Sequence, residues 1–381
     1  MRGRALAALV LAVFAVWTLP LAGLALAGRP VAAFLQFPPR TALVAQPPFA
    51  WSAFVIFSLP PLGALALYWA ALARARPGQA ARSAGKFPWW GWLGLALIAL
   101  AWPLAWSGAL ASAWRGQTFT LLWLGTILAL NALALRRQGW CPLAHRTGWF
   151  LWLFPLSAGF WWLFEYLNQF VHNWHYGGVR AESDWEYMVR ATLPFSTVLP
   201  AVASAWAWLR ASPRLDAMTL PPLRGHGALA WLALAAGAIG LATIGLRPEL
   251  SFPLLWVAPL LVLAGLQQLI AGETLFSALA RGDWRAVLQP ALAALVCGFF
   301  WEMWNWGSLP KWHYAVPYVQ RFQLFEMPIL GYAGYLPFGV ECALLMDLAA
   351  RIIERRPLWP LEDGSAGLPR RAPTAPPPLR I

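Results

Sequence analysis

The segment WEMWNWGSLPKWHY, residues 301–314, combines side chains that could do chemistry with a strongly apolar sequence around them. It holds an acid, an amide and an imidazole among four tryptophans: Glu302, Asn305 and His313. Polar groups of this kind are unfavourable next to lipid unless they pair with one another or act on a ligand. The segment is therefore a candidate functional site.

A second segment, EYLNQFVHNWHY at residues 165–176, carries the same residue types in the same order, as Glu165, Asn168 and His175. In both segments the acid precedes the amide by three residues, a spacing that puts the two side chains on one face of a helix. We expect the two sets to face each other and to form one polar cluster.

One hypothesis for this cluster is a metal site. Two carboxylates and two imidazoles, from Glu165, His175, Glu302 and His313, could ligate a divalent ion such as zinc, manganese or iron. Carboxylate-bridged di-iron centres use a Glu-x-x-His spacing on helices, whereas this chain has Glu-x-x-Asn with the histidine farther on. The residue types therefore fit a metal site, but their spacing differs from that of a di-iron centre.

A second hypothesis needs no metal. A glutamate kept protonated near lipid can act as a general acid, and tryptophan faces can stabilise a cationic ligand or intermediate. Glu302 and Glu341 are then the acid–base candidates, Asn305 orients them, and His313 serves as a base or a ligand. Glu326, in the stretch LFEMPILGYAGYLPFG, is a further available acid.

A structural alternative is an aromatic belt, because tryptophan and tyrosine concentrate at the headgroup depth of membranes. The glutamates would then cap helices or pair locally. A belt requires aromatic rings, but it does not require that Glu-x-x-Asn and Trp-His-Tyr return together in each segment. This joint recurrence favours a functional interpretation.

The segment at residues 301–314 carries additional features in the sequence that follows it. Glu341 aligns with Val198 when LPFGVE is laid on LPFSTV, so only the C-terminal half has this acid. The glycines and prolines between Pro328 and Gly339 predict a broken or re-entrant segment, and a flexible outer loop is the alternative. The C-terminal half is thus the expected working half.

The elements that must position these residues are membrane-spanning helices. With 60% hydrophobic and 11% charged residues, the chain has more apolar surface than one soluble core could bury. Apolar runs long enough to cross about 30 Å of hydrocarbon recur along it. We expect an all-α polytopic protein with about ten spans, at residues 5–27, 51–72, 89–112, 119–135, 149–170, 194–209, 227–246, 252–271, 287–306 and 335–352.

The first run is longer than the core of a signal peptide, which favours an uncleaved anchor. The net charge of +13 does not indicate a nucleic-acid partner, because the basic residues fall in short loops between spans. Their distribution favours cytosolic N- and C-termini in the plasma (inner) membrane. The expected partners are membrane lipids or a hydrophobic small molecule.

The chain also shows an internal repeat. FTLLWLGTILALNAL at residues 119–133 resembles FPLLWVAPLLVLAGL at residues 252–266, and the two Glu-x-x-Asn segments follow in the same order. Units with an even number of spans enter the membrane in the same sense. We expect two N-terminal helices in 1–88, parallel four-helix repeats in 89–210 and 227–352, a cytosolic linker in 211–226 and a disordered cytosolic tail in 353–381.

Several other chemistries lack their motifs. The sequence contains no Gly-x-Gly-x-x-Gly fingerprint, Walker loop or Gly-x-Ser-x-Gly elbow, and five histidines are too few for histidine-rich boxes. The three cysteines, Cys141, Cys297 and Cys342, suit neither a disulfide framework nor a zinc site, so we interpret them as packing residues.

These patterns predict a membrane enzyme that acts on a lipid or isoprenoid-like substrate from an outward-facing site, by acid–base or metal-assisted chemistry. A proton- or cation-coupled carrier is the alternative, because polar sites of carriers lie where repeats meet. A non-catalytic membrane assembly subunit is the third possibility.

Overall fold

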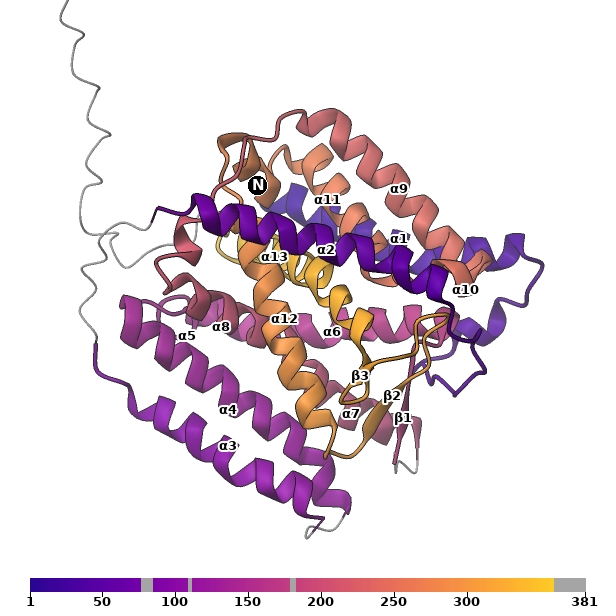
Figure 1. The fold of residues 1–381 in the computed structure, drawn as a ribbon, viewed down its shortest axis with the longest axis horizontal. Helices are drawn as coiled ribbons and strands as arrows, with labels where there is room; N and C mark the ends of the chain where they lie inside the picture. Colours follow the sequence, from indigo (N-terminus) through magenta and orange to yellow (C-terminus); the bar gives the residue numbers. More distant parts are fainter. Residues whose placement is uncertain (77–84, 109–111, 179–182, 360–381) are drawn as a thin grey trace, which may run out of the picture.

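The computed structural model of the chain describes residues 1–76, 85–108, 112–178 and 183–359. Helices make up most of this part of the chain, and strands form two small antiparallel sheets (Figure 1). The prediction of a mostly helical protein is confirmed. The long helices are α1 (Arg2–Leu26), α2 (Trp51–Arg74), α3 (Trp89–Ser107), α4 (Ser112–Gln138), α6 (Thr147–Val171), α7 (Asp184–Phe195), α8 (Val198–Arg210), α9 (His226–Leu246), α11 (Ala258–Ala271), α12 (Arg285–Asn305) and α13 (Tyr335–Ile353).

Short elements connect these helices. The strands are β1 (Trp174–Gly177), β2 (Lys311–Tyr314), β3 (Gln323–Leu324) and β4 (Met327–Pro328). The short helices are α5 (Pro142–His145), α10 (Pro248–Ser251), η1 (Ala32–Leu35), η2 (Leu215–Ala217), η3 (Phe252–Trp256), η4 (Leu275–Arg281) and η5 (Ile329–Gly334), where η marks a 3₁₀ turn.

Eight helices within the described residues are long and apolar enough to cross a membrane, and a bent pair at 248–271, broken by 51°, can count as a ninth span. These helices indicate a membrane protein. The tenth expected span is helix α13, which is not among them because it carries Glu341, Asp347 and Arg351. It is instead buried along most of its length by neighbouring helices.

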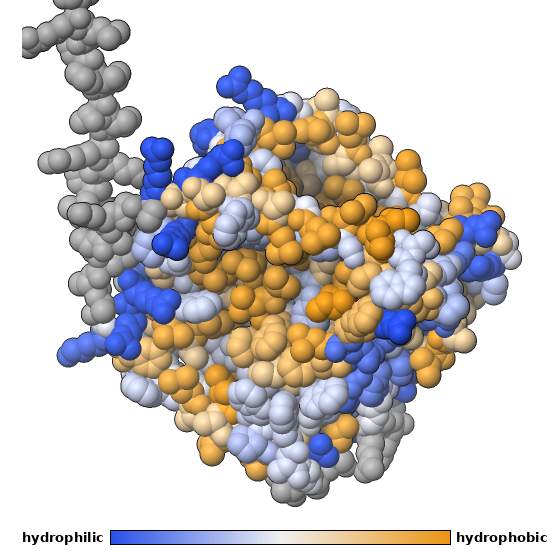
Figure 2. Space-filling model, in the orientation of Figure 1, coloured by the Kyte–Doolittle hydropathy of each residue, from blue (hydrophilic) through white to orange (hydrophobic). Residues whose placement is uncertain are grey.

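The outer helices present apolar side chains to the surroundings. Figure 2 shows hydrophobic residues over the centre of the face that α2 crosses and hydrophilic residues mostly toward the edges. Along α2, Val55, Ile56, Leu59, Leu62 and Leu65 are each more than half exposed. A continuous apolar face of this size on a soluble monomer would be unusual, and lipid is the medium that suits it.

Small residues allow the helices to approach closely, as is common between membrane helices. A Cβ atom on Gly23 of α1 would come within 1.8 Å of the Ala242 carbonyl oxygen on α9, and one on Gly245 within 1.9 Å of the Pro20 carbonyl oxygen. The α1–α9 crossing therefore requires glycine at both positions. Helix α1 belongs to the folded bundle, packed on α9 and α11.

A similar contact positions the later part of the chain. A Cβ atom on Gly298 of α12 would come within 2.3 Å of the Tyr335 ring, and one on Gly339 of α13 within 2.2 Å of the Pro290 carbonyl oxygen. Helices α12 and α13 therefore cross with the Tyr335 ring packed against Gly298 of α12. This packing fixes the start of α13 against the end of α12.

The C-terminal part of α13 is tied by a buried ion pair. Arg351 Nε lies 2.7 Å from Asp347 Oδ2, as the i, i+4 spacing predicts, and both side chains are almost fully buried. Asp347 also accepts hydrogen bonds from Gln267 Nε2 at 2.6 Å and from the Leu358 backbone N–H at 2.7 Å. The last described residues are thereby held against the bundle.

Three expectations about connecting segments change. Leu358 and Trp359 fall in the expected tail, yet they are buried, and Trp359 stacks on Trp206 and donates to Asp283 Oδ2 at 3.3 Å. Residues 360–381 of that tail lie outside the described residues. The glycine- and proline-rich stretch before α13 forms the β3–β4 hairpin and η5, whereas the sharp break lies between η3 and α11.

The cysteine interpretation agrees with the structure. Cys141, Cys297 and Cys342 are free thiols, and all three are buried among apolar side chains. The Cys141 thiol has a pKa raised to about 11, chiefly because burial disfavours the thiolate. None of the three therefore behaves as a reactive surface thiol.

Candidate functional site

The two Trp-His-Tyr segments form neighbouring strands and pair with each other. Strands β1 and β2 are antiparallel, with Trp174 opposite Tyr314, His175 opposite His313 and Tyr176 opposite Trp312. Figure 1 shows the two strands side by side near the end of α12. The structure thus brings together two segments that lie far apart in the sequence.

Each strand is held by the asparagine of the helix that precedes it. Asn168 Nδ2 donates to the Trp174 carbonyl oxygen at 2.8 Å, and its Oδ1 accepts from the Trp174 N–H at 3.3 Å and from the Asn173 N–H at 2.9 Å. Asn305 Nδ2 donates to the Trp312 carbonyl oxygen at 2.8 Å, and its Oδ1 accepts from the Trp312 N–H at 2.9 Å. Both asparagine side chains are completely buried and replace backbone pairing for the strand.

The glutamate one turn earlier binds the aromatic side chains of the same strand. Glu165 Oε1 accepts from Tyr176 Oη at 2.6 Å, from Trp161 Nε1 at 2.9 Å and from Trp174 Nε1 at 3.1 Å. The carboxyl group is 1% exposed. Burial of a carboxylate is tolerable when several donors point at it, and three donors do so here.

Glu302 has the same relation to β2 and one difference. Its Oε1 accepts from Tyr314 Oη at 2.8 Å, and its Oε2 accepts from Trp312 Nε1 at 3.3 Å. The difference is a donor from another helix, because Tyr335 Oη at the start of α13 also donates to Oε1 at 2.8 Å. Glu302 is fully buried and joins three elements.

The histidines lie on the other side of the strands. Side chains alternate along a strand, so His175 and His313 point away from the face on which the neighbouring tryptophans and tyrosines meet the glutamates. The two imidazoles stack on each other with ring centroids 5.6 Å apart. His313 Nδ1 lies 3.1 Å from Glu326 Oε2, and Lys311 Nζ lies 2.6 Å from Glu326 Oε1.

Burial and neighbouring charges shift the pKa values of two side chains on this side of the strands, His175 and Glu326. Burial, together with the neighbouring His313, lowers the pKa of His175 below its usual value. Burial alone would raise the pKa of Glu326, but the hydrogen bonds and charges of Lys311 and His313 leave it below its usual value. Glu326 is therefore an ionised anchor for β2 at neutral pH.

The ligand set of the metal hypothesis is split between the two faces of the β1–β2 pair. Glu165 and Glu302 lie behind one face with tryptophan and tyrosine donors, and His175 and His313 lie on the other. Within the described part of the chain, no three side chains of histidine, cysteine, aspartate or glutamate come together in a way that could hold a metal ion. The geometry therefore favours hydrogen bonding of the acids to aromatic groups over ligation by these four residues.

Glu341 lies apart from this cluster. It is on α13 and 3% exposed, and its Oε2 has no hydrogen-bond partner among the described residues. It does not line the large cavity described next. The structure thus separates the two acids that the sequence suggested as an acid–base pair.

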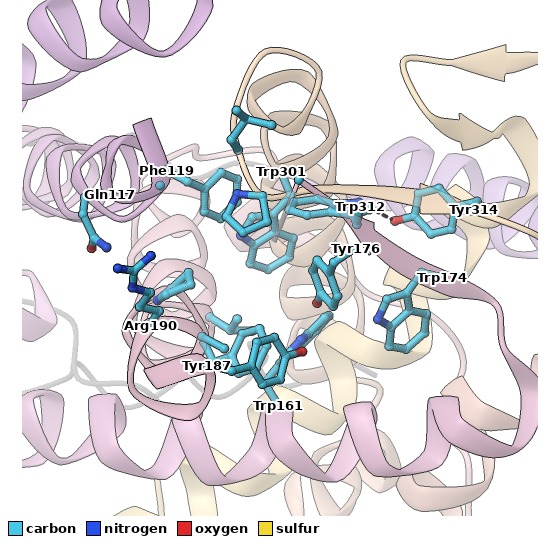
Figure 3. A pocket seen from close by; sticks show the side chains of 18 of the residues that line it. Gln117, Phe119, Trp161, Trp174, Tyr176, Tyr187, Arg190, Trp301, Trp312 and Tyr314 are labelled. Atoms are coloured by element: carbon cyan, nitrogen blue, oxygen red, sulfur yellow. Dashed lines mark hydrogen bonds between the residues drawn. The ribbon is translucent and has the colours of Figure 1, made fainter. Parts of the chain in front are cut away.

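A cavity of about 550 Å³ lies in front of the two glutamates (Figure 3). Five tryptophans line it, from α6, β1, η3, α12 and β2: Trp161, Trp174, Trp256, Trp301 and Trp312. Four tyrosines line it as well: Tyr176, Tyr187, Tyr314 and Tyr335. All six side chains that donate to Glu165 or Glu302 belong to these two sets.

The tyrosines are held as neutral donors. Tyr176 and Tyr314 border the cavity, but protein surrounds their hydroxyl groups on the other sides. This burial, followed by the charge of the neighbouring glutamate, raises the pKa of the Tyr176 and Tyr314 phenols well above the usual value. The cavity wall therefore carries phenol O–H groups that point at buried acids.

One side of the cavity is more polar. Gln117 of α4 and the pair Glu186 and Arg190 of α7 line it there, with Arg190 Nη2 2.5 Å from Glu186 Oε1. Figure 3 shows Gln117 and Arg190 together on the side opposite Trp174. The charges of this pair offset each other, so its net contribution to the cavity is small.

Sequence reasoning located the acids and amides and missed most of the wall. Trp161, Trp256, Tyr187 and Tyr335 were not singled out, although GYAGY contains Tyr335. The recurring Trp-His-Tyr triplets were noted for their histidines, whereas the tryptophans and tyrosines face the cavity. The available signal in each triplet was the tryptophan N–H and the tyrosine O–H, which can donate to a buried acid.

No protein-family model, curated protein or solved structure matches this chain. Inferences about its function therefore depend on the geometry of the cavity and of the two buried acids.

Proposed function

We propose that this chain is a membrane-embedded enzyme that transfers a proton to and from an unsaturated, isoprenoid-like lipid held in the aromatic cavity. The observation that carries the proposal is the position of Glu302, which is fully buried yet one hydroxyl group away from the cavity through Tyr314 and Tyr335. A carboxyl group in such a place can serve as a general acid and base.

The chemistry needs no co-reactant. In the structure the Tyr335 O–H donates to Glu302. In the proposed step Glu302 is protonated and the Tyr335 O–H is turned toward the cavity, so that Glu302 passes its proton to the phenol oxygen as the phenol gives its own proton to a carbon–carbon double bond of the substrate. One C–H bond forms, and a carboxylate and a carbocation remain. Loss of a proton from a neighbouring carbon returns the proton by the same route, so the net result is an isomerised or cyclised product.

The wall suits such a substrate. A cavity of about 550 Å³ lined chiefly by tryptophan and tyrosine buries an apolar chain and excludes water, which would otherwise capture a carbocation. Asn168 and Asn305 act on the reaction only by fixing the strands that carry the donors. His175, His313 and Glu326 hold the outer face of the same strands.

The orientation belongs to the proposal as well. The distribution of arginines supports a plasma-membrane protein with both termini in the cytosol, and in that orientation the cavity lies on the outer side. The substrate then enters from the outer leaflet. The repeated sequence pattern is explained if two parallel units, at residues 89–210 and 227–352, meet at the β1–β2 pair.

A carrier is the second candidate, and Glu341 supports it. A buried carboxyl oxygen without a hydrogen-bond partner in the middle of an enclosed helix is a feature of proton- or cation-coupled transport. In that case Glu341 binds the coupling ion, and the aromatic cavity binds the transported molecule.

Deuterium labelling tests the proposed enzyme without a known substrate. Membranes containing the protein are incubated in D₂O, and extracted lipids are examined by mass spectrometry for deuterium bound to carbon. We expect labelled isoprenoid lipids with the wild-type protein and a loss of about 100-fold or more with Glu302→Gln, because general acid catalysis contributes roughly 10²–10⁴-fold. The glutamine keeps an oxygen that accepts from Tyr314 and Tyr335.

The matched control is Glu273→Gln, which makes the same change at a side chain that is 67% exposed and remote from the cavity. This variant should label lipids at the wild-type rate. Equal labelling in membranes with and without the protein would refute the enzyme, and pH-driven uptake abolished by Glu341→Gln would then favour the carrier.

A further inference from the structure

We propose that the aromatic cavity is a binding site for an organic cation, with tryptophan and tyrosine rings around the positive charge and Glu165 and Glu302 behind them. This inference rests on the proposed function for its account of a carbocation, but the binding itself does not depend on catalysis. The inference adds to the proposed function that the bound ligand is positively charged.

The ring arrangement is the first support. Aromatic side chains from separate elements surround one space, and Tyr176 points into it between Trp161 and Trp301 (Figure 3). Trp174 packs against Trp161 at 6.2 Å and against Trp256 at 5.8 Å between centroids, which makes one continuous aromatic wall. A cation near the face of such rings is attracted by their negative electron density.

The two acids strengthen this attraction. Each accepts hydrogen bonds from three cavity-lining side chains, so each acid in its ionised form, which Glu302 reaches once it has given up its proton, places negative charge directly behind one of the two paired strands. A phenol or indole that donates to a carboxylate becomes more electron-rich on its ring. Glu165 and Glu302 therefore make the cavity negative through the rings, without contacting the ligand.

The same charges disfavour an anion. Among the described residues that line the cavity, Arg190 alone is positively charged, and Glu186 at 2.5 Å offsets it. Phosphate and carboxylate sites in proteins use cationic forks or clustered N–H donors aimed at the ligand. Here six of the nine indole and phenol groups that line the cavity donate to the glutamates instead.

Two sources could supply the cation. One is a permanent charge, such as a quaternary ammonium headgroup, which aromatic cages bind. The other is the carbocation formed when Glu302 protonates the substrate. Both are bulky, weakly hydrated cations, so both use the same rings.

The test compares two probes of equal shape on the detergent-purified wild-type protein. Benzyltrimethylammonium carries the charge, and neopentylbenzene replaces its nitrogen by carbon. Isothermal titration calorimetry should give at least about tenfold tighter binding of the ammonium probe, as expected when several ring faces act together. Equal affinity, or tighter binding of the neutral probe, would overturn the cation site.

A charge variant makes the comparison sharper. Glu165→Gln keeps the oxygen that Trp161, Trp174 and Tyr176 donate to and removes the negative charge. The preference for ammonium should fall several-fold while binding of neopentylbenzene stays the same. Glu273→Gln should leave both affinities unchanged. An unaltered preference in Glu165→Gln would contradict the role of the buried acids.

Two readouts separate the sources. If the cation is transient, benzyltrimethylammonium inhibits the deuterium labelling of isoprenoid lipids. If it is permanent, native mass spectrometry shows a lipid with an ammonium headgroup that the probe displaces. A preference for ammonium without any deuterium labelling would keep the cation site and refute the proton-transfer function, so the two proposals fail separately.

Discussion

Asn305→Ala should release strand β2 while leaving the rest of the bundle folded. The substitution removes the hydrogen bond from Asn305 Nδ2 to the Trp312 carbonyl oxygen at 2.8 Å and the one from the Trp312 N–H to Oδ1 at 2.9 Å. Each bond contributes roughly 0.5–1.5 kcal/mol, and each group left buried and unpaired costs about 1–3 kcal/mol. We expect the strand to lose about 2–4 kcal/mol of local stability.

Hydrogen exchange measures this loss directly. Because about 1.4 kcal/mol is a factor of ten, the backbone amides of residues 311–314 should exchange roughly 30-fold faster or more. Mass spectrometry of the peptide that covers β2 reports the rate. Strand β1 should loosen with it, because the two strands pair.

Asn131→Ala is the matched control for this experiment. Asn131 is also completely buried, and it donates to Ser204 Oγ at 2.7 Å and accepts from the Leu143 N–H at 3.1 Å, far from the strands. Its loss should destabilise the bundle without a selective effect on β2. If β2 exchanges at the wild-type rate in Asn305→Ala, the asparagine does not hold the strand, and the structural role assigned to the Glu-x-x-Asn pattern is wrong.

Two further predictions concern charges. Asp347→Ala leaves Arg351 buried without the carboxylate 2.7 Å from it, which should lower the free energy of unfolding by about 3–5 kcal/mol. Thermal unfolding measured with a thiol-reactive dye, which reports exposure of the buried cysteines, tests this. The control Glu273→Ala should lower the free energy of unfolding very little. Acidification should loosen the β1–β2 pair, because the folded-state pKa values of His175 and Glu326 are both lowered. The stability that these two groups contribute is complete above their unfolded-state pKa values, about 6.5 and 4.3. It is lost as the pH falls toward the folded-state pKa values. Hydrogen exchange of residues 174–177 that is independent of this acidification, after correction for intrinsic rates, would contradict the assignment.

Hydropathy was sufficient to locate the membrane helices. Apolar runs of membrane-spanning length are a composition signal, and they predicted the positions of α1, α2, α3, α4, α6, α9 and α12, with shifts at the ends. The prediction was less exact where a proline or a turn interrupts an apolar run. The run at 252–271 divides into η3 and α11 because Pro259 stands at the start of the second helix, and residues 194–209 belong to α7 and α8, which follow each other at Ser196 and Thr197.

The site was less accessible from sequence, because it depends on two short strands. Four-residue strands have no hydrophobic periodicity long enough to recognise, so the sequence pattern did not identify Trp-His-Tyr as a strand. Once the segment is a strand, alternation separates His175 from Trp174 and Tyr176. The metal hypothesis followed from residue types and could not include this alternation. The internal repeat itself stays a prediction, and the pairing of β1 with β2 is the contact that it would explain.

The two acids are chemically alike, but their supports differ. Among the described residues, the donors to Glu165 all come from one continuous stretch, residues 161–176, so helix and strand hold it as a local unit. Glu302 accepts a hydrogen bond from Tyr314 of β2 and another from Tyr335 at the start of α13. Tyr335 follows the β3–β4 hairpin and η5, and its ring packs against Gly298 of α12.

A shift of α13 relative to α12 therefore changes the number of donors at Glu302 and leaves those at Glu165 unaltered. Fewer donors favour the protonated acid, because hydrogen bonds to a carboxylate stabilise its charged form. The proton affinity of Glu302 is thus coupled to the position of one helix, whereas the donors to Glu165 do not depend on that helix. Under the proposed function, this asymmetry favours proton transfer by the C-terminal half and electrostatic support by the N-terminal half.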